Sequence, residues 1–329
     1  MPITRLGLQI PSFTYPNVPD AQLFERIAAI ATTAEASGFD SVWVMDHFYQ
    51  IRGVGPRTND MLEAYTLLGG IAARTSRVNL GTLVTGVTYR NPALLAKVVT
   101  TLDIVSSGRA VLGIGAAWNE DEHNGYGFRF PPVRERMERL EEALQICRAM
   151  FRAERPTFEG RHYRTQEALN VPAPIQAGGP PIMIGGQGEK KTLRLMAEHA
   201  EMANFTSGFD ELPRKLEVLA GHCTDVGRDP STINKTSLST VIHAPTMEEA
   251  EQLRNGFLKA RGLDWDTLDE GTRTALSARL VVGDPDTVGE QAQRLIGLGL
   301  DGVCFNLPAT GHDPQMVGDA VATMVKAVA

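Results

Sequence analysis

The sequence is poor in cysteine. Its 329 residues include three cysteines, Cys147, Cys223 and Cys304, which lie far apart and form no CxxC pair. So small and odd a number argues against a disulfide framework, and the spacing does not match a zinc site. We therefore expect core thiols in a reducing compartment, which predicts a cytoplasmic protein.

Long hydrophobic runs and an excess of positive charge are also missing. No stretch approaches eighteen consecutive apolar residues, and the first ten residues, MPITRLGLQI, lack the zones of a signal peptide. The formal net charge is −7, whereas binding to nucleic acid requires a basic surface. The composition, 43% hydrophobic and 22% charged, is that of a globular chain with ample material for a core. We expect neither a membrane nor a nucleic acid as partner.

What the sequence does contain is an alternation of short apolar runs and helical patterns. The runs are nearly continuous, as in strands of a parallel sheet that is buried on both faces. The first helical pattern starts after Asp20, a candidate N-cap, and stops at Gly38. Eight βα units over this length favour a (β/α)8 barrel, the TIM barrel, over an open doubly wound sheet. The predicted strands are 6–10, 41–46, 78–84, 109–115, 181–186, 201–205, 236–243 and 302–308.

Two insertions interrupt this alternation. Residues 152–180 contain a β-hairpin pattern, PTFEGRHYR, and a loop rich in proline and glycine, and residues 260–288 add a helix-like segment before the last unit. Neither resembles a linker, so residues 1–329 are expected to form one domain. His162 and Tyr163 lie in the hairpin, where exposure is the default expectation, with the barrel mouth as the alternative.

Polar side chains follow several of the predicted strands. In a (β/α)8 barrel, chemistry sits at the carboxyl ends of the strands. The second strand ends in Asp46 and His47, and an imidazole there can move a proton near neutral pH or hydrogen-bond an anion. The simpler alternative is that His47 caps the strand through the backbone. Later strands end near Asn204, His243 and Asn306.

The glycine-rich segment GGQGEKKT, residues 185–192, has the chemistry of a phosphate site. Glycines allow backbone N–H groups to approach a ligand closely, and a helix expected to start near Glu189 would favour an anion at its N-terminus. Lys190, Lys191 and Arg194 add positive charge nearby. The alternative is a plain turn, because neither the Walker pattern nor a complete GxGxxG pattern is matched.

The segment GIGAAWNEDEH, residues 113–123, follows the fourth strand. A tryptophan such as Trp118 is usually a core residue, whereas Asn119 just beyond a strand end suits a ligand contact or a helix cap. The acidic run 120–122 and His123 show no repeated ligand spacing, so we expect these side chains in solvent and no metal site. The first strand, LGLQI, also lacks the HxH pattern of metal-dependent barrel hydrolases.

Four segments in this order, GFDSVWVMDHF, LGTLVTGVTYRNPALLAK, VLGIGAAWNEDEHNGYG and PIMIGGQGEKKTLRLMAEHAEMANF, resemble the luciferase-like monooxygenase superfamily. More narrowly, they resemble its branch that uses the deazaflavin coenzyme F420. The likeness runs from the first strand to about residue 206 and continues weakly in 281–308. It implies a (β/α)8 barrel with a flavin or deazaflavin ring across its top.

The resemblance also implies roles for particular residues. Asp46 and His47 match a pair beside the ring, where His47 would stabilise the reduced coenzyme or carry a proton. A non-proline cis peptide behind the ring would fall at Leu83–Val84, and the basic cluster near residue 190 suits an acidic coenzyme tail. The expected catalytic residues are His47 and Asp46, and the expected coenzyme contacts are Asp46, His47, Leu83, Val84, Thr85, Gly115, Ala116, Asn119, Gly185, Gly186 and Gln187.

The sequence departs from this family pattern at two positions. Similar dehydrogenases of alcohols and sugar phosphates carry an acid/base glutamate where this chain has Ala116, and an aromatic residue where it has Ile51. Reduction of an activated double bond, an imine or a methylene-tetrahydropterin is easier without that carboxylate. The leading hypothesis is therefore an F420-dependent oxidoreductase acting on a small molecule. The alternatives are an FMNH2-dependent monooxygenase, a flavin-binding barrel without catalysis, and a metal-dependent hydrolase.

Family analogy further suggests a homodimer that packs through the early barrel helices. The helical patterns at 63–75 and 92–106 carry rich apolar faces. A stripe that faces the barrel has the same pattern, so the sequence does not separate the two uses of these residues.

Overall fold

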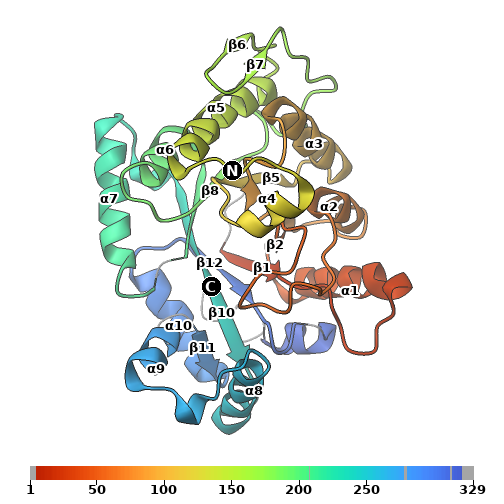
Figure 1. The fold of residues 1–329 in the computed structure, drawn as a ribbon, viewed down its shortest axis with the longest axis vertical. Helices are drawn as coiled ribbons and strands as arrows, with labels where there is room; N and C mark the ends of the chain where they lie inside the picture. The colour runs from red at the N-terminus through yellow and green to blue at the C-terminus, as the bar shows by residue number, and fades with distance from the viewer. Residues whose placement is uncertain (1–4, 207, 278–279, 312, 321–329) are drawn as a thin grey trace.

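The structure is a computed structural model that describes residues 5–206, 208–277, 280–311 and 313–320. Its central element is a parallel sheet in which each strand pairs with the next and the last pairs with the first (Figure 1). The sheet is therefore a closed barrel, and the predicted (β/α)8 fold is confirmed. In order around the barrel the strands are β1 (Leu6–Ile10), β2 (Ser41–Val44), β3 (Asn79–Thr82), β5 (Ala110–Gly115), β8 (Ile182–Gly185), β9 (Met202–Phe205), β10 (Asn234–His243) and β12 (Gly302–Asn306).

Helices follow the strands and cover the outside of the barrel (Figure 1). Their apolar faces and the outward faces of the strands form the larger of two buried clusters. Among the described residues, no helix has the length and apolar character needed to cross a membrane. The surrounding helices are α1 (Leu23–Ser37), α2 (Ala64–Ala72), α3 (Pro92–Val105), α5 (Val133–Phe151), α6 (Thr192–His199), α7 (Leu212–Asp225), α8 (Met247–Lys259) and α10 (Pro285–Gly297).

The inside of the barrel is filled by a second apolar cluster around Trp43. Trp43 is fully buried, and its indole N–H donates to Ser41 Oγ at 3.0 Å. Two neighbouring strands carry glycine at this level: a Cβ on Gly7 would lie 2.8 Å from Trp43 Nε1, and a Cβ on Gly81 would lie 2.7 Å from Trp43 Cζ3. The indole thus occupies the barrel interior below the carboxyl ends of the strands.

The insertions agree in part with the prediction. Residues 152–180 contain the antiparallel pair β6 (Phe158–Glu159) and β7 (Arg164–Thr165), as expected. Residues 260–288 contain not only a helix, α9 (Glu270–Ser277), but also a strand, β11 (Leu280–Gly283), that pairs in parallel with β10 outside the barrel. The prediction of a helix-like segment alone was therefore wrong. The four residues of β11 form a strand beside the longer β10, and so short a run carries no helical periodicity.

Several predicted boundaries shift by a few residues. Asp20 is not the N-cap of α1 but the first residue of a short 3₁₀ helix, η1 (Asp20–Gln22), whereas Gly38 ends α1 with φ 108°, as expected. The third strand ends at Thr82 instead of residue 84, and a short strand, β4 (Thr85–Gly86), then pairs with β5. The backbone between β3 and β4 leaves the sheet at the rim of the barrel.

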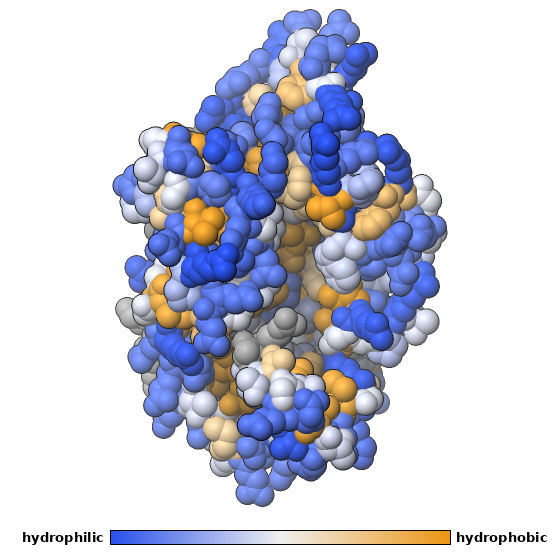
Figure 2. Space-filling view, turned by 60° about the vertical axis from the view of Figure 1, so that its left-hand side comes forward, coloured by the Kyte–Doolittle hydropathy of each residue, from blue (hydrophilic) through white to orange (hydrophobic). Residues whose placement is uncertain are grey.

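The face drawn in Figure 2 is mostly hydrophilic, which agrees with the net charge of −7. Hydrophobic residues are visible there mainly as isolated groups and inside a hollow near its centre. Scattered apolar residues of this kind are usual on a globular protein.

The contact between β3 and β5 predicts the effect of a single methyl group. A Cβ on Gly113 would lie 1.9 Å from the backbone oxygen of Thr82, so Gly113→Ala must push two barrel strands apart. We expect the free energy of unfolding to fall by about 3 kcal/mol. Gly221→Ala is the matched control, because this exposed glycine of α7 has no atom within 4 Å of an added Cβ and should gain about 0.5–1 kcal/mol.

Urea unfolding followed by circular dichroism measures both variants. Equal stability of Gly113→Ala and the wild type would contradict the close approach of these strands.

Candidate active site

A cavity of about 550 Å³ opens at the carboxyl ends of the barrel strands. It contains all the predicted site residues except Asn119, so predicted residues from four βα units, those of β2, β3, β5 and β8, meet as the barrel fold requires. Asn119 is half-buried at the start of α4 (Glu120–Tyr126) and its carbonyl oxygen is hydrogen-bonded to His123 Nδ1 at 2.6 Å. The lining is Gln9, Met45, Asp46, His47, Ile51, Val54, Leu83, Val84, Thr85, Gly86, Tyr89, Gly115, Ala116, Ala117, Trp118, Leu140, Gly185, Gly186, Gln187, Thr192, Asn204, Thr206, Leu238 and Asn306.

Asp46 is held by an arginine that the sequence did not single out. Both carboxylate oxygens accept from the Arg90 guanidinium, at 2.7 and 2.9 Å, and the Gly86 N–H donates to the same group at 3.3 Å. Burial raises the pKa of Asp46, and the charge of Arg90 opposes that shift. With both oxygens engaged by Arg90, Asp46 ties the end of β2 to residues 86–90.

His47 has a carboxylate partner as well. Its Nδ1 lies 2.8 Å from Glu122 Oε2, across 75 residues of sequence. An ionised carboxylate can only accept, so Nδ1 carries the hydrogen and Nε2 is the nitrogen that remains for a ligand in the cavity. The simpler prediction, that His47 caps the strand through the backbone, is wrong, because its Nδ1 is bonded to the Glu122 side chain.

Glu122 is the centre of this arrangement and corrects the expectation of a solvated acidic run. Its side chain is fully buried and also accepts from the N–H groups of Phe48 and Tyr49 and from the Tyr89 hydroxyl, the last at 2.8 Å. Burial alone would raise the pKa of Glu122, but the hydrogen bonds from His47, Tyr49 and Tyr89 outweigh it and hold the pKa below its ordinary value. A carboxylate with four donors stays ionised without exposure to water.

Sequence reasoning missed Glu122 because its neighbours on α4, Glu120 and Asp121, are exposed. The structure buries Glu122 and His123 of α4, whereas the sequence analysis placed both side chains in solvent. An aromatic layer of Phe48, Tyr126 and Phe128 packs over this side of the site, with ring centroids 4.6 Å apart for Phe48 and Tyr126 and 5.8 Å apart for Phe48 and Phe128.

Val84 stands between two glycines at the floor of the cavity. The Leu83–Val84 peptide bond is cis, as the resemblance implied. A Cβ on Gly115 would lie 2.9 Å from Val84 Cγ2, and a Cβ on Gly185 would lie 2.8 Å from Val84 Cγ1. Both glycines therefore make room for the Val84 side chain. The sequence analysis explained Gly185 only as part of a phosphate site and did not include this packing role.

The glycine-rich segment after β8 leads to α6, which begins at Thr192 rather than near Glu189. Gly186 has φ 141° and donates its N–H to the Asn204 carbonyl at 3.1 Å, and a Cβ there would lie 3.0 Å from Thr192 Cγ2. Gly186, Gln187 and Thr192 line the cavity, so this end of it meets the N-terminus of a helix.

The nearby basic cluster is not part of the cavity lining. Lys190 and Lys191 are exposed, and Arg194 is paired with Glu198 at 2.9 Å. Glu189, between the glycines and α6, is paired with Lys215 at 2.7 Å and Arg214 at 3.0 Å. The sequence placed these charges near the glycine-rich segment correctly, but they lie outside the cavity.

Amide side chains supply polar groups on the opposite side of the barrel. Gln9 Nε2 donates to the Leu83 carbonyl at 3.2 Å, and Asn306 Nδ2 donates to Gln9 Oε1 at 3.2 Å. Asn204 Nδ2 donates to Thr236 Oγ1 at 3.0 Å. Gln9 was missed as a site residue, although a lone glutamine within the apolar strand LGLQI was a usable signal.

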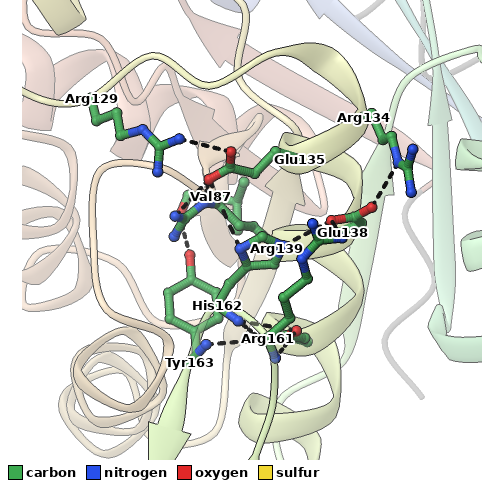
Figure 3. A network of polar contacts seen from close by, with 10 residues as sticks. Val87, Arg129, Arg134, Glu135, Glu138, Arg139, Arg161, His162 and Tyr163 are labelled. Atoms are coloured by element: carbon green, nitrogen blue, oxygen red, sulfur yellow. Dashed lines mark hydrogen bonds and ion pairs between the residues drawn. The ribbon is translucent and has the colours of Figure 1, made fainter.

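His162 and Tyr163 do not line the cavity. Figure 3 shows them held against α5, where His162 Nε2 lies 2.9 Å from Glu138 and the Tyr163 hydroxyl donates to the Val87 carbonyl at 3.4 Å. His243, at the end of β10, is buried outside the cavity, and burial lowers its pKa. No group of three or more potential metal ligands gathers anywhere in the described part of the chain.

Comparison with known proteins places these features in a family. The family model described as luciferase-like monooxygenase matches residues 4–302. An F420-dependent glucose-6-phosphate dehydrogenase from Kineococcus radiotolerans is 30% identical in an alignment of 307 residues. The alignment covers 86% of this chain and 87% of the relative.

Two solved structures share the fold. One is an F420-dependent secondary alcohol dehydrogenase in complex with an F420-acetone adduct, at a TM-score of 0.81, with 20% identity and 99% of each chain covered. The other is the EDTA monooxygenase EmoA from Chelativorans sp. BNC1, at a TM-score of 0.83, with 17% identity, 99% of this chain and 93% of that chain covered.

The Glu122 carboxylate predicts a specific pH dependence of stability. Since its folded-state pKa lies below the ordinary value of 4.5, its contribution is present above pH 4.5 and is lost as the pH falls through the folded pKa. Glu122→Gln should lower the free energy of unfolding at pH 7 by about 1–3 kcal/mol, because buried donors lose their acceptor. The variant should also lose part of the acid dependence below the ordinary pKa of 4.5.

Urea titrations at a series of pH values provide the measurement. Glu120→Gln is the matched control, an exposed glutamate in the same helix turn whose removal should leave the profile unchanged. Parallel pH profiles for the wild type and Glu122→Gln would rule out the buried ionised carboxylate.

Proposed function

Because the chain belongs to the luciferase-like monooxygenase family, we propose that it is an oxidoreductase that uses the deazaflavin coenzyme F420 to transfer a hydride to or from a small organic substrate. The observation that carries the proposal is the hydrogen bond between His47 and Glu122. His47 lines the cavity, as does Val84, and Glu122 holds the imidazole from behind. The F420-dependent relative at 30% identity supports the choice of coenzyme.

The cavity suits such a coenzyme in shape and in donor chemistry. Val84 and Leu83 offer an apolar surface for one face of a planar ring, and the amides of Gln9 and Asn306 suit the ring's imide-like edge. The helix terminus at Thr192 suits a phosphate. Asn119, which the resemblance places at the ring edge, stays a prediction. When bound, the coenzyme supplies or accepts the hydride.

His47 would handle the accompanying proton. Its Nε2 is left for a ligand because Nδ1 is engaged by Glu122, and this hydrogen bond fixes the orientation of the ring. Glu122 is thus a positioning residue for His47. Asp46, held on both oxygens by Arg90, would position the β2 end rather than exchange a proton.

The described lining offers no further acid or base for an alcohol substrate. Among the described lining residues Asp46 is the one carboxylate, and position 116 carries alanine. Oxidation of an alcohol needs a base for the hydroxyl proton in addition to a group beside the coenzyme. We therefore propose reduction of an activated double bond or imine, in contrast to the dehydrogenases among the relatives.

A monooxygenase that uses FMNH2 is the second candidate, since EmoA shares the fold at a TM-score of 0.83.

We also propose that the protein works in the cytoplasm, because its three cysteines are buried and free.

Coenzyme choice is the first point to test. We expect purified protein to bind F420 at least about tenfold more tightly than FMN in parallel calorimetric titrations. Gly186→Val should weaken F420 binding about tenfold, because its φ of 141° and the nearby Thr192 leave no room for the side chain. Gly227→Val is the control: this glycine also has a positive φ, 67°, but lies outside the cavity lining.

Tight FMN binding with oxygen consumption after reduction would move the protein to the monooxygenase branch. Failure of both coenzymes to bind would overturn the assignment of the cavity.

The proposal extends to a homodimer that packs through the side of the barrel formed by α3. Leu94 and Val105 of α3 are exposed, and the chain from 169 to 175 runs along this helix, anchored by Asn170 Nδ2 to Thr100 Oγ1 at 2.8 Å. That chain exposes three more apolar side chains, Leu169, Val171 and Ile175. A second copy would cover this row.

The row of apolar residues predicts how the assembly responds to charge. The double variant Leu94→Asp, Val171→Asp should convert a dimer into a monomer in size-exclusion chromatography with light scattering, because buried unpaired carboxylates are costly. Val133→Asp, an equally exposed apolar position on α5, should leave the dimer intact. A monomeric wild type at micromolar concentration would exclude the dimer.

A further inference from the structure

Trp118 is unusual among the residues that line the cavity. Its side chain is 59% exposed, although a large apolar side chain normally gains by burial. It lies at the mouth with its ring centroid 5.5 Å from that of His47 and an interplanar angle of 70°. The expectation of a core tryptophan is therefore wrong for Trp118, and the indole surface is free for contact beside the proposed proton carrier.

The backbone under this indole is fixed. Ala117 adopts φ 60°, a left-handed conformation that costs energy for alanine. Arg136, a buried residue of α5, donates to the carbonyl oxygens of Ala116 and Ala117 and to that of Pro131 at 3.0 Å. Its guanidinium also lies 4.5 Å from the centroid of the Phe130 ring. The segment therefore presents Trp118 at a defined place.

The cavity that the indole borders has a largely apolar lining and offers no positive charge to a ligand. Ile51, Val54, Leu140 and Leu238 are among the apolar lining residues. The Asp46 carboxylate is paired with Arg90, which also binds Glu63, and none of the lining residues that the structure describes is a lysine or an arginine. A dianionic sugar phosphate, the substrate that the name of the Kineococcus relative implies, would find no cation within this lining.

We propose that Trp118 is a substrate platform and that the substrate is an uncharged, planar, conjugated molecule stacked on the indole. The inference rests on the proposed function and adds the substrate class to it. In the reaction, one carbon of an electron-poor double bond gains a hydride and the other gains a proton, while the reduced deazaflavin loses two electrons. Stacking on Trp118 places the double bond next to His47, the source of the proton.

Benzylideneacetone, a planar neutral enone, is the probe, and trans-cinnamate is its charged counterpart. Calorimetry in the presence of oxidised F420 gives the Kd of each probe without turnover, and oxidation of F420H2 gives kcat and KM. For benzylideneacetone, Trp118→Ala should raise both Kd and KM about tenfold with little change in kcat, because the indole face is lost. Trp118→Phe should restore most of the affinity.

Val133→Ala, which removes an exposed apolar side chain outside the cavity, should change neither constant. Binding of F420 itself should be the same in all variants. Tighter binding of trans-cinnamate than of benzylideneacetone, turnover of glucose 6-phosphate, or an unchanged Kd in Trp118→Ala would each overturn the substrate class. F420 binding with no binding of benzylideneacetone would also overturn it but leave the proposed function standing, whereas failure of F420 to bind would remove both.

Discussion

The site depends on one buried carboxylate, Glu122. It joins the loop after β2 to the helix after β5 through hydrogen bonds from His47, Tyr89 and two backbone N–H groups. A buried charge is tolerable only when its acceptor capacity is satisfied in this way. The same bonds select the tautomer of His47, so the fold and the proposed proton transfer share one electrostatic constraint.

The floor of the site obeys a second constraint, which is steric. Trp43 occupies the barrel interior, and Val84 rises above it between Gly115 and Gly185. Glycines at the ends of two neighbouring strands, β5 and β8, are therefore required by packing, whether or not a ligand approaches them. The cavity is confined to the carboxyl ends of the strands because the space below is already filled.

The chain combines family features with features that set it apart. The cis peptide at Leu83–Val84 agrees with the resemblance, and the luciferase-like family model covers residues 4–302. Ala116 and Ile51 depart from the pattern that the resemblance gives for sugar-phosphate dehydrogenases, and both line the same cavity.

The sequence by itself determined the barrel, its eight strands and the set of strand-end residues around the cavity, because hydrophobic periodicity and strand-end position are local properties of the chain. Only the tertiary structure decided the partners. Glu122 meets His47 across 75 residues, Arg90 meets Asp46 across 44, and the extra strand β11 exists because β10 lies beside it. Whether an acidic residue is solvated or buried, and whether a tryptophan is core or surface, depends on contacts that no local pattern records. That is why Glu122 and Trp118 were both misjudged from sequence.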